Sequence, residues 1–214
     1  MDVSRQQSTN AVDEAERGPK ARTRRLMLET ATRLMQGGAT PSVSEAAEAA
    51  GVSRATAYRY FPSQAALVQA VVDEGLGPIL TWRSEKTDPA ERVADLIDTS
   101  LPRIEEFEAT FKAALKLSLE QWAKRQAGTL GAEPQFTRGH RIDLLRDALA
   151  PLRGALPPEQ VDRLAQALSL VFGVEVLIVL KDIWGLDGDQ TRAVAQWAAA
   201  TLVRGAAGEH AGEH

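Results

Sequence analysis

Residues 44–63 read SEAAEAAGVSRATAYRYFPS, and this stretch decides the fold. Its two polar and alanine-rich halves predict short helices at about 45–50 and 54–60, separated by Gly51. Glycine adopts positive φ at no steric cost, so Gly51 can end the first helix, and Ser53 can cap the second. A glycine at such a corner lets two helices cross steeply, which is the geometry of a helix-turn-helix.

Helical patterns continue on both sides of this corner. Met27, Ala31, Leu34 and Met35 predict a first helix at about 21–36, and Ser42 or Ser44 is expected to cap the helix at 45–50. Further helices are expected from Gln64 to the early 80s and at about 89–107, 109–126, 138–153, 158–184 and 189–205. We expect Pro102 and Pro151 to kink or break their helices, residues 126–139 to form a mobile loop, and Asp187 with Gln190 to form a capping box.

The predicted fold is all-α, with about nine helices and no alternating strand pattern. We expect a disordered arm at 1–19, a three-helix DNA-binding domain of helix-turn-helix type at 20–65, a helical effector-binding and dimerisation bundle at 66–206, and a disordered tail at 207–214. The 214 residues are 44% hydrophobic and 25% charged, which is ordinary for a globular protein.

Charge is distributed unevenly along the chain. The net charge is −4, yet residues 17–60 hold eight basic side chains against three acidic ones. A basic module joined to an acidic body is typical of a DNA-binding protein that has a second task.

Several other classes of protein are disfavoured. There is no cysteine, and of the three histidines two lie in the tail, so we expect no enzyme, no metal site and no cofactor. No catalytic motif is present. Residues 1–19 are polar, and the longest apolar run, 170–180, is too short to cross a membrane, so we expect neither a signal peptide nor a membrane partner, and a cytoplasmic location.

The second short helix carries side chains suited to DNA. Arg54 and Thr56 lie on its first turn, where side chains reach base edges in the major groove, and arginine donates two hydrogen bonds to guanine. Tyr58, Arg59 and Tyr60 carry donors for phosphate oxygens, and backbone N–H groups near Ser44 and Ser53 favour anions. Phe61 is expected in the core.

This stretch resembles the DNA-binding signature of the TetR family of tetracycline-repressor-like regulators. The resemblance covers about 50 residues, and the Gly-Val-Ser, Thr-x-Tyr and Tyr-Phe elements keep their mutual spacing. It implies base-edge contacts near Ser44, Arg54, Ala55 and Thr56 and phosphate contacts from Ser42, Tyr58 and Tyr60. The family often has lysine where this chain has Gln64, which can still donate to phosphate but carries no charge. Phosphate affinity is then expected to depend on Lys20, Arg22, Arg24 and Arg25.

The resemblance also implies that the last two long helices form a four-helix dimer interface. Helix 158–184 is apolar on more than one face, and helix 189–205 has apolar residues at helical spacing. The expected interface residues are Leu164, Leu168, Val171, Ile178, Val194, Trp197, Ala198, Thr201 and Leu202. A plain monomer core is the alternative.

A small, mostly apolar effector is expected within the bundle. Its candidate contacts are Phe107, Phe111, Leu115, Leu119, Trp122, His140, Leu144, Phe172 and Glu175. Glu175 interrupts an apolar run and needs a partner, which could be a cation across the dimer, solvent or a ligand. The leading hypothesis is a homodimeric repressor that an effector releases from a near-palindromic double-stranded operator. The alternatives are a DNA-binding regulator controlled by a protein partner or by abundance, and an enzyme.

Overall fold

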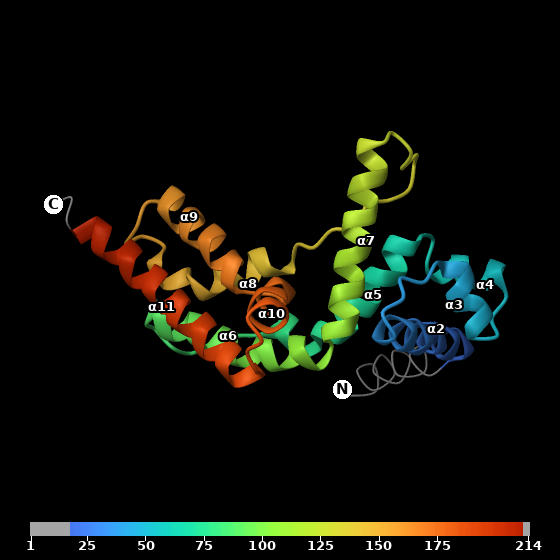
Figure 1. The fold of residues 1–214 in the computed structure, drawn as a ribbon, viewed down its shortest axis with the longest axis horizontal. Helices are drawn as coiled ribbons and strands as arrows, with labels where there is room; N and C mark the ends of the chain where they lie inside the picture. Colours follow the sequence, from blue (N-terminus) through green and yellow to red (C-terminus); the bar gives the residue numbers. More distant parts are fainter. Residues whose placement is uncertain (1–17, 212–214) are drawn as a thin grey trace, which may run out of the picture. The chain divides into compact units, whose positions relative to one another are not determined.

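The computed structural model describes residues 18–211, which contain ten α-helices and no β-strand (Figure 1). The all-α fold is therefore confirmed. The chain divides into two compact units, residues 18–72 with 113–136, and residues 73–112 with 137–211. No single helix among these residues is long and apolar enough to cross a membrane, and the pair 158–171 and 174–183 reaches that length only jointly, with a bend of 46°.

The first unit is built from four N-terminal helices and part of a fifth. They are α2 (Pro19–Gln36), α3 (Val43–Ala49), α4 (Arg54–Tyr60), α5 (Gln64–Leu76) and α7 (Glu108–Gln126), with α5 and α7 each continuing into the second unit. Helices α2, α3 and α4 contact one another in pairs. Their shared core holds Met27, Met35, Ala46, Ala57 and Phe61, all at most 2% exposed, so the expected core position of Phe61 is confirmed.

The segment after α7 is anchored by one buried side chain. The Gln121 amide donates to the carbonyl of Pro134 at 3.1 Å and accepts from the backbone N–H of Phe136 at 2.8 Å. Phe136 is itself buried. The stretch expected to be a mobile loop is thus non-helical, as predicted, but its far end is fixed to α7.

The second unit packs two long helices side by side. Helix α6 (Pro89–Glu106) lies along α11 (Gly188–Ala211), and α8 (His140–Ala148) and α9 (Pro158–Leu168) pack around this pair (Figure 1). Shorter elements connect them: η1 (Gly77–Thr81), η2 (Ala150–Leu152), η3 (Ser169–Val171), α10 (Val174–Leu177) and the π-helix η4 (Ile178–Ile183). The predicted capping box begins α11, since Asp187 and Gln190 exchange backbone-to-side-chain hydrogen bonds of 3.0 and 2.8 Å.

Gly173 breaks the long helix that the sequence predicted over 158–184. Its backbone has φ 113° and ψ −172°, a region that is essentially reserved for glycine. The chain therefore leaves α9 through η3, turns at Gly173 and begins α10, so the predicted continuous helix is wrong.

Three smaller expectations also need correction. Pro102 lies inside α6, which continues to Glu106 without a break. Helix α11 extends to Ala211, so residues 207–211 are helical rather than disordered, and residues 212–214 lie outside the described part. Gly18 and Pro19 begin α2, whereas the remainder of the expected arm, residues 1–17, lies outside the described part.

Candidate nucleic-acid interface

Two serine caps fix where α3 and α4 begin. Ser42, rather than Ser44, is the N-cap of α3: its hydroxyl accepts from the Glu45 N–H at 3.2 Å, and the Glu45 carboxylate accepts from the Ser42 N–H at 2.7 Å. The backbone hydrogen bond from Ser42 holds the pKa of Glu45 below its ordinary value. Ser53 caps α4 by accepting from the Thr56 N–H at 3.2 Å.

Gly51 makes the corner between the two helices. Its φ is +64°, and a Cβ placed there would meet nothing within 4 Å, so backbone conformation alone requires glycine. Across the corner, the Ser44 hydroxyl lies 3.4 Å from the Tyr58 hydroxyl. This hydrogen bond connects α3 to the exposed side of α4.

Helix α4 buries one side chain and exposes its donors. Ala57 is fully buried, whereas Arg54, Ala55, Tyr58 and Arg59 are exposed. Ser53 is also exposed, and Thr56 and Tyr60 are half-buried at the edges of this face. The exposed face therefore offers two guanidinium groups and a phenol, and residues 53–60 contain no carboxylate.

Helix α2 adds positive charge to the same unit. Lys20, Arg22, Arg24 and Arg25 are all exposed, and the Arg24 guanidinium lies 5.6 Å from the ring centre of Phe61, which follows α4. Residues 18–60 hold seven basic side chains against three acidic ones. Such an excess attracts a polyanion at long range.

Gln64 has a structural task in addition to any contact with phosphate. Its side-chain Nε2 donates to the carbonyl of Thr40 at 2.7 Å, and the residue is half-buried. The amide thus holds the segment before α3 against the start of α5. One of its two amide hydrogens is therefore occupied within the chain.

This arrangement defines a helix-turn-helix DNA-binding domain, and a comparison with known protein families finds a match to it. Residues 27–71 match the family described as bacterial regulatory proteins, tetR family. These residues span most of α2, all of α3 and α4, and α5 as far as Val71. The helix-turn-helix domain of this chain is therefore similar to that of TetR-family transcriptional regulators.

Solved structures share the fold along most of the chain. A TetR transcriptional regulator from Rhodococcus sp. RHA1 is 18% identical, with a TM-score of 0.56 over 87% of this chain and 97% of that one. A putative fatty acid metabolism regulator from Clostridium perfringens is 17% identical, with a TM-score of 0.56 over 83% and 97%. No curated protein matches the sequence.

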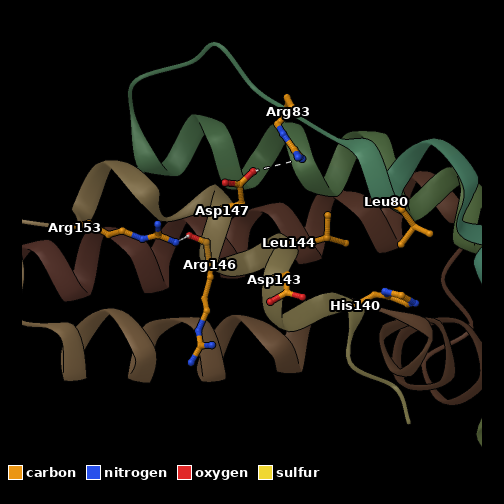
Figure 2. Close-up of a pocket in the computed structure, with 8 residues that line it drawn as sticks. All are labelled: Leu80, Arg83, His140, Asp143, Leu144, Arg146, Asp147 and Arg153. Atoms are coloured by element: carbon orange, nitrogen blue, oxygen red, sulfur yellow. Dashed lines mark hydrogen bonds and ion pairs between the residues drawn. The ribbon is translucent and has the colours of Figure 1, made fainter. Parts of the chain in front are cut away.

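The predicted effector contacts lie in both units of the chain. Leu119 and Trp122 are more than half exposed. Leu115 is half-buried. Phe107 and Phe111 pack closely around the position of Gly75, which indicates a packing role in the second unit. Phe172 is buried, whereas His140 and Leu144 line an open pocket (Figure 2).

Glu175 has its partners within its own chain. Its two carboxylate oxygens each accept a hydrogen bond of 2.6 Å, one from Arg138 and one from Arg141. Burial raises the pKa of Glu175, but the charge and hydrogen bond of Arg141, together with Arg138, outweigh burial and hold the pKa below its ordinary value. An intrachain partner was not among the predicted alternatives, because both arginines lie more than 30 residues away in sequence.

The predicted dimer residues separate into two groups. Leu164 and Leu168 are buried in the core of the second unit, so they are not available to a partner chain, and the prediction is corrected for these two. The others retain exposed surface: Val194, Trp197 and Thr201 are exposed, and Val171, Ile178, Ala198 and Leu202 are half-buried. Leu170, Ile183 and Trp184 are also exposed, and the sequence interpretation did not include them.

Proposed function

We propose that this regulator is a homodimeric repressor that reads a near-palindromic operator through α4 and is released from it by a small molecule. One observation carries the DNA-binding part of the proposal. Helix α4 packs through Ala57 and presents Arg54, Tyr58 and Arg59 to solvent, on a unit with excess positive charge.

Each exposed group has a chemical task in this proposal. Arg54, on the first turn, donates two hydrogen bonds to a guanine edge in the major groove, and Ala55 and Thr56 contact neighbouring bases. Tyr58, Arg59 and Tyr60 donate to phosphates on one side of the groove. The exposed basic residues of α2 donate to phosphates further along the backbone.

Exposed apolar side chains of the second unit support a dimer. Leu170 is 80% exposed, Ile183 and Trp184 are 73% exposed, and Trp197 is 69% exposed. They lie on or directly beside η3, η4 and α11, and α11 contacts both of the other elements. Large apolar side chains gathered on neighbouring elements are typical of a protein interface, and a second copy of the chain is the partner that a palindromic operator requires.

Selection from a random double-stranded DNA library tests the operator. We expect a consensus of two inverted half-sites whose centres are about one helical turn, or a whole number of turns, apart. Recovery of a single asymmetric half-site, or of no consensus at physiological salt, would contradict the proposal.

Sedimentation of single-residue variants tests the dimer. Trp197→Lys places a charge on the proposed interface and is expected to yield monomers at concentrations where the wild type is dimeric. Trp122→Lys is the matched control, because Trp122 is also exposed but lies in the first unit. A wild-type chain that sediments as a monomer, or a Trp197→Lys variant that remains dimeric, would rule out this interface.

A further inference from the structure

An open pocket of about 430 Å³ runs along α8 in the second unit (Figure 2). This is within the usual size of small-molecule sites, roughly 300–1,000 Å³. His140, Asp143, Leu144 and Asp147 recur every three or four residues, so they share one face of the helix over about 10 Å. Arg83 and Arg153 complete the end near Asp147.

The C-terminal end of this pocket is rich in guanidinium groups with unused donors. Arg153 donates to the carbonyl of Arg146 at 3.0 Å and has no carboxylate partner among residues 18–211. Arg83 is 3.9 Å from the Asp147 carboxylate, a long ion pair, and its side chain is 77% exposed. Arg146 extends away from Asp147 and pairs with Asp162 instead (Figure 2).

A buried cation lies beneath the same end. Arg92 is only 9% exposed and donates to the carbonyls of Ser84, Lys86, Asp147 and Ala148. No carboxylate in the described range is paired with it. Its charge offsets the negative end of the α8 dipole, so an anion placed near Arg83 and Arg153 is not repelled by the helix terminus.

The other end of the pocket has the opposite charge. The Asp143 carboxylate, on the first turn of α8, makes neither a hydrogen bond nor an ion pair with any part of the chain that the structure describes. Leu144 and Leu80 add apolar surface to the lining. The pocket therefore combines a carboxylate near the start of α8, apolar surface, and two guanidinium groups near the end of α8.

We propose that this pocket binds a small zwitterion, with an ammonium group and a carboxylate at opposite ends of a short apolar spacer. The ligand carboxylate pairs with Arg83 and Arg153, and the ammonium group pairs with Asp143. A simple anion would pair with the arginines but leave Asp143 without a cation, and a simple cation would pair with Asp143 but leave the arginines without an anion. The two opposite charges of the pocket therefore disfavour ligands that carry only one charged group.

One residue of the pocket lining also contacts α5. His140 lines the pocket, and its Nε2 is 2.7 Å from the Asp73 carboxylate on the last turns of α5. A ligand ammonium group beside His140 competes for this contact and changes how the end of α5 is held. The role of the zwitterion as the effector rests on the proposed function. The binding of the zwitterion to this pocket does not.

Calorimetric titration of the full chain tests the binding. The probes are 4-aminobutanoate, 6-aminohexanoate and 8-aminooctanoate, with hexanoate and hexylammonium as one-ended compounds. We expect one spacer length to bind best and both one-ended compounds to bind at least about tenfold more weakly, because each lacks one charge-assisted contact. No binding by any of the three zwitterions, or equal binding of hexanoate and 6-aminohexanoate, would overturn the proposal.

Variants assign the binding to this pocket. Asp143→Asn and Arg153→Gln are each expected to weaken the best probe about tenfold or more, whereas Glu48→Gln and Arg125→Gln, exposed and in the first unit, leave it unchanged. All four residues are exposed, so thermal unfolding is expected to stay unchanged and to show that each variant folds. Unaltered binding in Asp143→Asn would overturn the proposal. If the wild-type chain does not bind DNA, the proposed function is refuted, but the results of these titrations are unaffected. The two failures are therefore distinguishable.

Discussion

Replacement of Gly173 by alanine probes the break that separates α9 from α10. The backbone at φ 113° and ψ −172° costs about 1–3 kcal/mol for a residue with a Cβ. The added methyl would also lie 3.0 Å from Arg141 Nη2 and 3.1 Å from Glu175 Oε2, so this ion pair must shift. Because the ion pair is partly exposed, weakening it lowers the free energy of unfolding by only about 1 kcal/mol. Together these effects lower the free energy of unfolding by about 2–4 kcal/mol.

Thermal unfolding followed by circular dichroism, at fixed protein concentration, measures the effect. One kcal/mol corresponds to about 2–4 °C in a chain of this length, so Gly173→Ala is expected to lower the Tm by about 4–16 °C. Gly154→Ala is the control for backbone alone, since its φ is +94° and a Cβ there meets nothing within 4 Å. Gly205→Ala, in the interior of α11 with open space around it, is expected to raise the Tm slightly. Equal effects at Gly173 and Gly154 would refute the argument from the ion pair, and no loss at Gly173 would refute the break itself.

Three further predictions concern charged side chains. Arg92→Met leaves two carbonyls at the end of α8 without their donor. We expect it to lower the free energy of unfolding, measured in urea, by about 3 kcal/mol. A decrease below about 1 kcal/mol would contradict the capping role of Arg92. Glu175 has a folded-state pKa below its ordinary value of 4.5, so its ionised form stabilises the fold above that pH and the contribution is lost as the pH falls through the folded-state pKa. The Tm difference between the wild type and Glu175→Gln should therefore be largest near neutral pH and should close in acid, and a difference that widens in acid would contradict this. Arg24→Gln is expected to reduce the slope of log affinity for DNA against log salt concentration by about 1. An unchanged slope would show that Arg24 does not contact a phosphate.

Features that depend only on neighbouring residues could be predicted from the sequence. Gly51, the cap at Ser53 and the capping box at Asp187 depend on residues within a few positions of one another, so a single sequence displays them. The ambiguity between Ser42 and Ser44 was settled by Glu45, which lies three residues after Ser42 and completes the box.

Features that depend on distant parts of the chain could not be predicted. The apolar pattern of 158–184 continues through Gly173, and only packing of Arg141 and Glu175 against that glycine shows why the helix stops there. Leu164 and Leu168 have the same apolar character as an interface residue, and their burial follows from the direction that α9 takes before the break. The pocket along α8 was missed because its charges alternate and its arginines come from separate segments.

The most direct test of the central claim is fluorescence anisotropy of the selected operator against a scrambled duplex, at one salt concentration, for the wild type and Arg54→Ala. If α4 reads DNA bases, the wild type binds the operator at least about 10³-fold more tightly than the scrambled duplex. Arg54→Ala is then expected to lose about 1–3 kcal/mol of this preference. Its affinity for the scrambled duplex is expected to fall by no more than the loss of one phosphate contact would cause. Equal discrimination by Arg54→Ala and the wild type would contradict the assignment of α4 as the recognition helix.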